Sequence, residues 1–206
     1  MLLHRLFKPL DYLRVHHPQK RKYDFWIPLI ISAVLIAVLY YLPLPVPITG
    51  DGGLLAIFTS LLQILVGFYI ASLAAVATFD RPSMDKVMLG DPPTLKINVR
   101  GKTETEKLTR RRFLSLLFGY LSLISFFLYF VGAFADLFEP NIRNLLPVIT
   151  LSYVKWISLY VYLFMVANLI VSTLLGLFYM TEKIHRDSEE IIVKKNSAKA
   201  KIVQDE

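Results

Sequence analysis

The chain alternates between long apolar stretches and shorter polar segments, and four of the apolar stretches have the length of a membrane span. A helix needs about 20 mostly apolar residues to cross roughly 30 Å of hydrocarbon. None of the four has the polar stripe that marks a surface helix of a soluble bundle. The pattern therefore predicts an all-α integral membrane protein with four transmembrane helices, at Phe25–Leu42, Leu54–Phe79, Phe113–Ala135 and Trp156–Met180.

Lysine and arginine collect in three of the five segments outside these spans. The N-terminal segment holds six of them, the middle loop nine and the C-terminal tail six, whereas the other two segments hold only Arg143 and Lys155. Cytoplasmic segments beside membrane spans carry such an excess, so both termini and the middle loop are predicted to be cytoplasmic. The expected parts are an amphipathic N-terminal segment (1–24), a transmembrane domain (25–180) that includes a cytoplasmic loop (80–112), and a C-terminal tail (181–206).

Composition removes several classes of function. The chain of 206 residues is 55% apolar, carries a net charge of +7 and has no cysteine. The absence of cysteine excludes disulfides, thiolate metal sites and cysteine nucleophiles. The positive charge follows from the membrane orientation, so we expect no direct binding of nucleic acid.

No sequence motif indicates catalysis. Phosphate-binding loops, nucleophile elbows and zinc-protease signatures are absent from the sequence. His16 and His17 are adjacent and cannot share one helical face, and no carboxylate lies at metal-ligand spacing from them. We therefore expect no enzyme activity, no metal site and no cofactor.

Two amides are the notable polar groups inside the spans. Gln63 lies in the second span and Asn168 in the fourth, while the middle of every span lacks ionisable residues. Proton relays and coupled transporters normally need intramembrane ionisable groups, so a proton-driven transporter is disfavoured. The amides are expected to join helices, by bonding each other or a neighbouring copy, and the alternative is that they line a pore.

The first 15 residues have the pattern of an amphipathic helix. Apolar side chains fall on one face and Arg5, Lys8 and Arg14 lie elsewhere; the apolar set is Leu3, Leu6, Phe7, Leu10 and Leu13. This arrangement predicts a helix that lies in the inner membrane interface. The alternative is a helix packed on the cytoplasmic part of the protein itself.

The middle loop contains one predicted strand. Leu95, Ile97 and Val99 alternate with polar residues, and an isolated strand is not stable in water. The possible partners are the C-terminal tail, the same strand in another copy, or a sheet edge on a different protein. The residues expected to bind a partner are Leu95, Ile97, Val99, Ile191, Ile192 and Val193.

A helix is predicted to follow this strand. Thr103 and Glu106 have the spacing of a capping box, and the helix is expected to run on into the third span. At its entry to the membrane stand Arg110, Arg111 and Arg112. We expect these arginines to contact lipid headgroups and to stop translocation, rather than to bind a specific phosphate.

The second span carries a strip of small residues. Gly67, Ala71 and Ala75 recur at every fourth position, with Ala74 and Thr78 beside them. Small side chains allow two helix backbones to approach closely in lipid. The strip is therefore predicted to be a helix-packing seam, either within one subunit or between subunits.

The stretch FYIASLAAVATFDRPSMDKVM (68–88) and the four-span layout resemble the membrane subunit of the Kiwa bacterial antiphage system. The resemblance implies a homo-oligomeric inner-membrane sensor of phage attack that holds a cytosolic, DNA-binding effector against the membrane. It assigns no functional residue.

Three functions compete at this point. The first is a non-enzymatic membrane platform that oligomerises and recruits a cytosolic protein. The alternative is a small oligomeric ion channel or membrane-depolarising effector. The third, an enzyme acting on lipid, lacks a convincing base or nucleophile.

Overall fold

The computed structural model of this chain is mostly helical. Its elements follow the order η1 (Lys8–Arg14), η2 (Lys22–Trp26), α2 (Ile27–Tyr41), α3 (Leu54–Thr78), β1 (Thr94–Val99), β2 (Lys102–Lys107), α4 (Arg110–Leu145), α5 (Val148–Phe178) and η3 (Tyr179–Lys183). The residues that it describes are 7–44, 46–78, 84–87, 91–99, 102–145 and 147–183.

Four helices are long and apolar enough to cross a membrane, as in a multi-pass membrane protein. They extend over Lys22–Tyr41, Leu54–Thr78, Arg110–Leu145 and Ile149–Thr181, which confirms the number of predicted spans and their positions along the chain. The η2 turn is π-helical and continues directly into α2, and η3 likewise continues α5.

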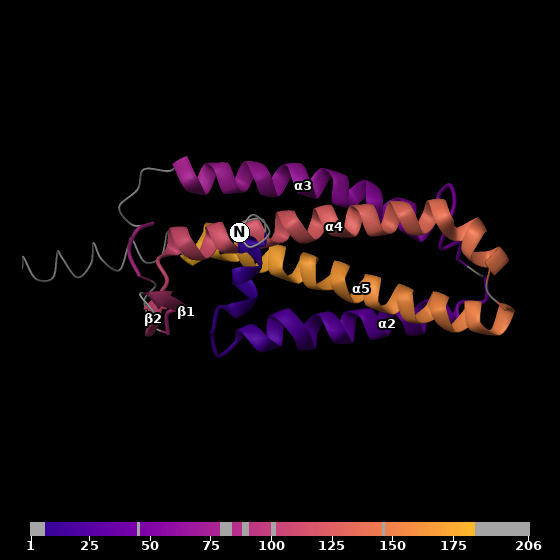
Figure 1. Cartoon of the computed structure of the whole chain (residues 1–206), viewed down its shortest axis with the longest axis horizontal. Helices are drawn as coiled ribbons and strands as arrows, with labels where there is room; N and C mark the ends of the chain where they lie inside the picture. The colour runs from indigo at the N-terminus through magenta and orange to yellow at the C-terminus, as the bar shows by residue number, and fades with distance from the viewer. Residues whose placement is uncertain are drawn as a thin grey trace, which may run out of the picture.

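The helices lie side by side in the order α3, α4, α5, α2 (Figure 1). The two central helices are more buried than the two edge helices. In the most apolar 18-residue stretch of each span, 44% and 50% is buried for α4 and α5, against 11% and 17% for α2 and α3. Helices α2 and α3 are consecutive in sequence and yet occupy opposite edges. Much of the apolar surface of the edge helices is therefore left for lipid or for another protein.

A seven-residue recurrence joins α3 to α4. The buried residues of α3 are Leu55, Leu62, Tyr69 and Val76. A period of seven keeps one seam of a helix against its neighbour when the two cross at a small angle. Helix α4 packs against this seam, with Phe118 beside Tyr69, and its buried residues include a row with the same period, Leu114, Leu121 and Leu128.

Gly132 lies where three helices meet. A Cβ atom at this α4 position would stand 2.8 Å from the hydroxyl of Tyr162 on α5 and 2.9 Å from the hydroxyl of Thr59 on α3. Real Cβ atoms essentially never come that close to another heavy atom. The missing side chain therefore lets both neighbours close on α4.

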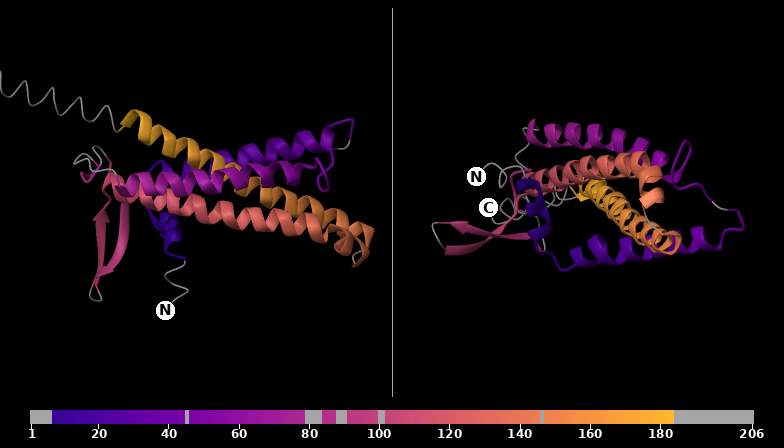
Figure 2. Two further views of the ribbon diagram at one scale, coloured as in Figure 1. Left: turned by 90° about the horizontal axis from the view of Figure 1, so that it is seen from above. Right: turned by 45° about the vertical axis from the view of Figure 1, so that its right-hand side comes forward.

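One end of the helix set carries the small folded parts of the chain. The β1–β2 hairpin, the N-terminal arm (residues 7–21) and the last turn of α5 all lie there, and we call it the hairpin end (Figure 1). Figure 2 shows the hairpin projecting sideways from the helices rather than continuing along them. The N-terminal arm packs on α4, and its Tyr12 and Val15 are only 1% and 3% exposed.

This packing places the arm on the protein itself rather than in the lipid interface, but the surface that it covers is α4 at Gly119 and Tyr120, inside the predicted third span. Its residues 8–14 form a 3-10 helix rather than a long amphipathic α-helix. Phe7 and Leu13, predicted to face lipid, remain 53% and 54% exposed. Leu3, Arg5 and Leu6 lie outside the described residues.

The predicted helix at 103–109 is wrong. Residues Lys102–Lys107 form β2, which pairs antiparallel with β1, from Thr94 opposite Lys107 to Val99 opposite Lys102. The partner of the predicted strand is thus its immediate successor in sequence. Thr103 and Thr105 suit a strand, and pairing satisfies backbone groups that a lone strand would leave open.

At the opposite end, α4 and α5 extend beyond the predicted spans. The segment 136–155 was predicted to lie outside the spans, but α4 continues through Pro140 to Leu145 and α5 begins at Val148. The 36 residues of α4 measure about 54 Å at 1.5 Å per residue, well over the thickness of a bilayer core. Asp136 accepts a hydrogen bond of 2.7 Å from the backbone N–H of Gly50, which connects the loop between α2 and α3 to α4.

We predict that Gly132→Ala lowers the midpoint of thermal unfolding in detergent. The added methyl must displace Tyr162 or Thr59, and overpacking of this kind typically costs about 1–3 kcal/mol. Gly119→Ala is the matched control, since it lies on the same helix and its Cβ would meet Pro9 at an ordinary 3.6 Å. Equal midpoints for the two variants would contradict the packing of three helices on Gly132.

Candidate functional site

A buried polar network connects the N-terminal arm to the helices at the hairpin end. Tyr12 of the arm stacks on Tyr120 of α4, with ring centroids 5.0 Å apart. The Tyr120 hydroxyl donates to Oδ1 of Asn168 on α5 at 3.1 Å, and the Tyr12 hydroxyl donates to Asp24 at 3.4 Å. Burial and the nearby Asp24 carboxylate raise the pKa of Tyr12, so its hydroxyl stays protonated and keeps donating.

Asn168 bonds a backbone carbonyl in the π-helical turn η2 that leads into α2. An α-helical bond from residue 28 to the carbonyl of Asp24 is ruled out, since Pro28 has no N–H. The Nδ2 group of Asn168 donates to this carbonyl at 2.7 Å. Asn168 therefore joins α5 to the start of α2, and neither of its bonds goes to Gln63, contrary to one predicted pairing.

Lys20 closes the network from the arm. Its ammonium donates to the carbonyls of Tyr12 and Leu13 at 2.7 and 3.1 Å, and it lies 3.4 Å from the Asp24 carboxylate. The same ammonium stands 4.5 Å from the centroid of the Tyr12 ring, within the range of a cation–π interaction. Burial lowers the pKa of Lys20, and the Asp24 charge opposes this shift and so favours the charged ammonium.

The second polar assembly surrounds the first turn of α4. Arg111 binds Asp85 through two hydrogen bonds of 2.7 and 3.1 Å, and it donates to the carbonyls of Val76 and Ala77 at the end of α3. Those carbonyls are among the last of α3, where a helix has no N–H of its own to offer. One guanidinium thus fixes the end of α3, the loop and the start of α4 to each other.

The arginines at the start of α4 have partners inside the chain. Cations are unfavourable at a helix N-terminus, and Asp85 and Glu106 offset this for Arg111 and Arg112. The hydrogen bonds from Arg111 lower the pKa of Asp85 below its ordinary 3.8, so this link stabilises the fold at neutral pH and is lost as the pH falls through that lowered value. Arg110 is 4% exposed, and the predicted headgroup contact of Arg110, Arg111 and Arg112 stays a prediction.

The predicted partner-binding residues have different surroundings. Leu95 is 4% exposed and belongs to the core, so its side chain is not available to a partner; Ile97 is half-buried against the same core. The side chain of Val99 and the tail residues Ile191, Ile192 and Val193 lie outside the described part. The exposed side of the hairpin instead carries Lys96 and its cross-strand neighbour Thr105.

The strip of small residues on α3 faces away from the chain. Gly67, Ala71, Ala74 and Thr78 are exposed and Ala75 is half-buried, and a Cβ on Gly67 would meet nothing within 4 Å. At about 100° per residue, Ala71 stands about 200° around the helix from the buried Tyr69. The strip therefore contacts no other helix among the described residues, and a seam between subunits stays a prediction.

Gln63 belongs to the same exposed side of α3. It precedes Gly67 by one further step of four residues, and its side chain has no hydrogen-bond partner among the described residues. An amide without a partner is costly in hydrocarbon. We therefore expect the Gln63 amide to bond a group outside the described residues.

The described residues hold no cluster of candidate metal ligands. Among them, no three of His, Asp and Glu lie together as metal ligands. No family model, no curated protein and no solved structure matches this chain. What it does must therefore be argued from its own contacts.

Three features escaped the sequence interpretation. Tyr12 and Asp24 lie in segments with no motif. Their roles depend on contacts of Tyr12 with Tyr120 and of Asp24 with Asn168, which are more than 100 residues away in sequence. Arg111 was visible as part of a basic run, but its acceptors on α3 were not. The α3 seam did have a signal, since Leu55, Leu62, Tyr69 and Val76 recur every seven residues.

We predict that Asn168→Leu destabilises the chain by about 1–3 kcal/mol, because it leaves the Asp24 carbonyl and the Tyr120 hydroxyl unpaired. The measurement is thermal unfolding in detergent, followed by circular dichroism. Thr181→Val is the control, since Thr181 is exposed and its hydroxyl bonds only carbonyls of its own helix. A larger loss for Thr181→Val than for Asn168→Leu would contradict this account of the network.

Proposed function

We propose that this chain is a non-enzymatic multi-pass protein of the bacterial inner membrane that assembles with copies of itself and recruits a cytosolic protein. In this proposal both termini and the hairpin are cytoplasmic. The distribution of Lys and Arg supports the orientation, because the helix ends that adjoin the three basic segments lie at the hairpin end. The two segments that connect the helices at the other end hold only Arg143 and Lys155.

The observation that carries the proposal is the rigid attachment of the hairpin. His16 of the arm and Thr94 of β1 exchange backbone hydrogen bonds of 2.8 and 3.0 Å. Arg112 of α4 binds Glu106 of β2 at 2.6 Å, and Leu95 packs into the core. A two-stranded hairpin alone is marginally stable in water, so these contacts hold it in one orientation relative to the helices.

This hairpin has the properties of a docking element. It projects sideways from the helices, so a partner can contact it without touching the helices themselves (Figure 2). Lys96 and Thr105 give its exposed side a polar surface, and paired strands offer free edges to which another strand can add. A pore would need no such element, so the hairpin favours recruitment over conduction.

Self-assembly is supported by the exposed side of α3. Gly67, Ala71 and Ala74 would allow a neighbouring helix to approach closely, and Gln63 would find its partner there. Two copies that pack through this strip would remove both the bare backbone and the unpaired amide from lipid. The resemblance to the Kiwa membrane subunit adds antiphage defence as the proposed setting, with the hairpin holding a cytosolic effector at the membrane.

Recruitment is tested by co-purification from cells of the native host in a mild detergent. We expect the native chain to recover a cytosolic protein and Lys96→Glu to recover several-fold less of it, because charge reversal opposes a complementary surface. Lys155→Glu makes the same change at the opposite end of the helices and should leave recovery unchanged. No recovered protein, or equal loss in both variants, would contradict recruitment by the hairpin.

Self-assembly is tested by the mass of the detergent-solubilised particle, measured by light scattering. Ala71→Leu should shift the population toward single chains, since overpacking a close helix contact costs about 1–3 kcal/mol. Ala77→Leu is the matched control, because Ala77 is exposed on the same helix but lies outside the strip. The same mass for both variants would refute assembly through the strip.

A small channel is the second candidate function, and the exposed Gln63 is the observation that favours it. In an assembly, this amide would line a pore if it faced a lumen instead of a neighbouring helix. We expect Gln63→Leu to weaken assembly without changing the ion conductance of planar bilayers. A change in single-channel conductance would instead favour the channel.

A further inference from the structure

A cavity of about 730 Å³ lies between α2 and α5 at the hairpin end. Its walls are the first turns of the α2 span, with Tyr23, Ile27 and Ile31, and the last turns of α5. The arm and the residues just before β1 close it on the side of the hairpin. Its volume is in the range of sites that bind small molecules.

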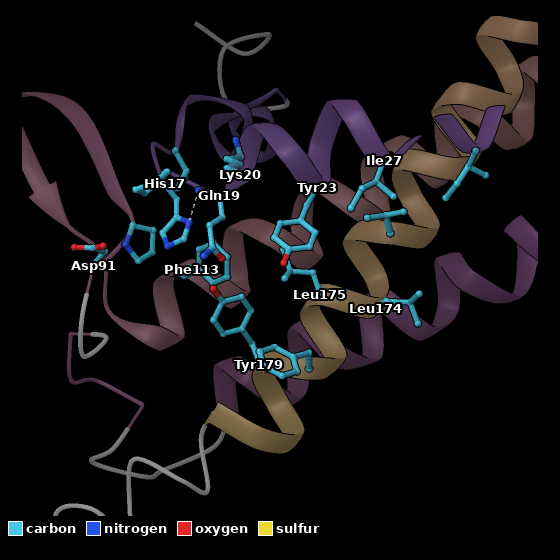
Figure 3. Close-up of a pocket in the computed structure, with 16 residues that line it drawn as sticks. His17, Gln19, Lys20, Tyr23, Ile27, Asp91, Phe113, Leu174, Leu175 and Tyr179 are labelled. Atoms are coloured by element: carbon cyan, nitrogen blue, oxygen red, sulfur yellow. Dashed lines mark hydrogen bonds between the residues drawn. The ribbon is translucent and has the colours of Figure 1, made fainter. Parts of the chain in front are cut away.

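The lining changes from polar to apolar along the helices. His17, Gln19 and Asp91 lie at one end of the cavity, and Ile27 and Leu174 lie at the other (Figure 3). Tyr23 and Tyr179 stand between, each with an apolar ring and a hydroxyl (Figure 3). This order matches a molecule with a polar head toward the hairpin and an apolar tail along the spans.

The apolar part of the cavity is open at the helix surface. Its lining residues Ile31, Leu174 and Phe178 are 38%, 61% and 48% exposed. All three belong to helices that are long and apolar enough to cross a membrane. A molecule of the surrounding bilayer can therefore enter sideways, without crossing the hairpin end.

We infer that this cavity binds one anionic phospholipid from the leaflet at the hairpin end. An acyl chain lies along Ile27, Leu174 and Leu175, where it replaces contacts that the cavity leaves unfilled. Gln19 and Tyr23 give hydrogen-bonding groups at the level of the headgroup. Arg21 and Lys22 directly precede Tyr23 in the chain and are exposed, and their two positive charges outnumber the Asp91 carboxylate of the lining. They attract a negative phosphate, since the Lys20 ammonium is already bonded to Asp24 and two carbonyls.

The bound lipid would connect the membrane to the docking element. The cavity touches the arm at Val15 and the approach to β1 at Pro93, and the arm pairs with β1 through His16 and Thr94. Filling or emptying it thus acts on the contacts that orient the hairpin. This inference goes beyond the proposed function and requires only that the helices lie in a membrane, so it can fail while recruitment and assembly stand.

The first experiment measures lipid that is retained by the full-length chain. The chain is extracted from vesicles of phosphatidylethanolamine and phosphatidylglycerol, washed in detergent and weighed by native mass spectrometry. We expect one phosphatidylglycerol per chain, reduced about tenfold by Leu175→Trp, whose ring fills the cavity. Leu177→Trp, on the same helix but outside the lining, should retain it.

Several results would overturn the inference: no retained lipid, retention of phosphatidylethanolamine as readily as phosphatidylglycerol, or equal retention by both tryptophan variants. A second measurement, photolabelling of the native chain, needs no variant.

Phosphatidylglycerol with a photoreactive group at the end of one acyl chain should label residues 171–179 and 23–31, and an excess of unlabelled phosphatidylglycerol should abolish this labelling. Labelling of the exposed side of α3 by bulk lipid should resist the same competition. Equal competition at both places would also overturn it.

Discussion

The hydrogen bond from Asn168 to the carbonyl of Asp24 is the contact on which the arrangement of α2 depends. Helix α2 is at one edge and buries little of its surface, so packing alone holds it weakly. Pro28 cannot donate an α-helical bond to the Asp24 carbonyl, and Asn168 donates to this carbonyl from α5. A hydrogen bond between two helices has a defined geometry, so this one sets where α2 begins against α5.

The same bond brings the N-terminal arm into the structure. Asp24 accepts from Tyr12 and pairs with Lys20, so the start of α2 and the arm share one acidic residue. The arm in turn pairs with β1 through His16 and Thr94. A chain of direct contacts thus runs from a buried amide on α5 to the hairpin, and the cavity lies beside that chain of contacts.

Arg111 performs the corresponding task at the other side of the hairpin end. It binds the last carbonyls of α3 and the Asp85 carboxylate, while its neighbour Arg112 holds β2 through Glu106. The hairpin is consequently fixed from two sides, by the arm and by the first turn of α4. An element held in this way keeps one orientation at the membrane surface, which suits a docking role.

The sequence by itself determined the four spans, because a run of about 20 apolar residues has few other stable environments. It also indicated the first strand, from the alternation of Leu95, Ile97 and Val99. It did not determine β2, since the Thr103 and Glu106 pattern suits a helix start as well, and pairing with β1 decided the outcome.

On α3 two recurrences compete, small residues every four positions and large ones every seven. Only the tertiary structure decided that the large ones face α4, because burial of Leu62 and Tyr69 against a central helix removes more apolar surface than burial of Gly67 and Ala71. The partners of Asn168 and Arg111 were likewise decided by tertiary structure, since they come from segments far apart in the chain.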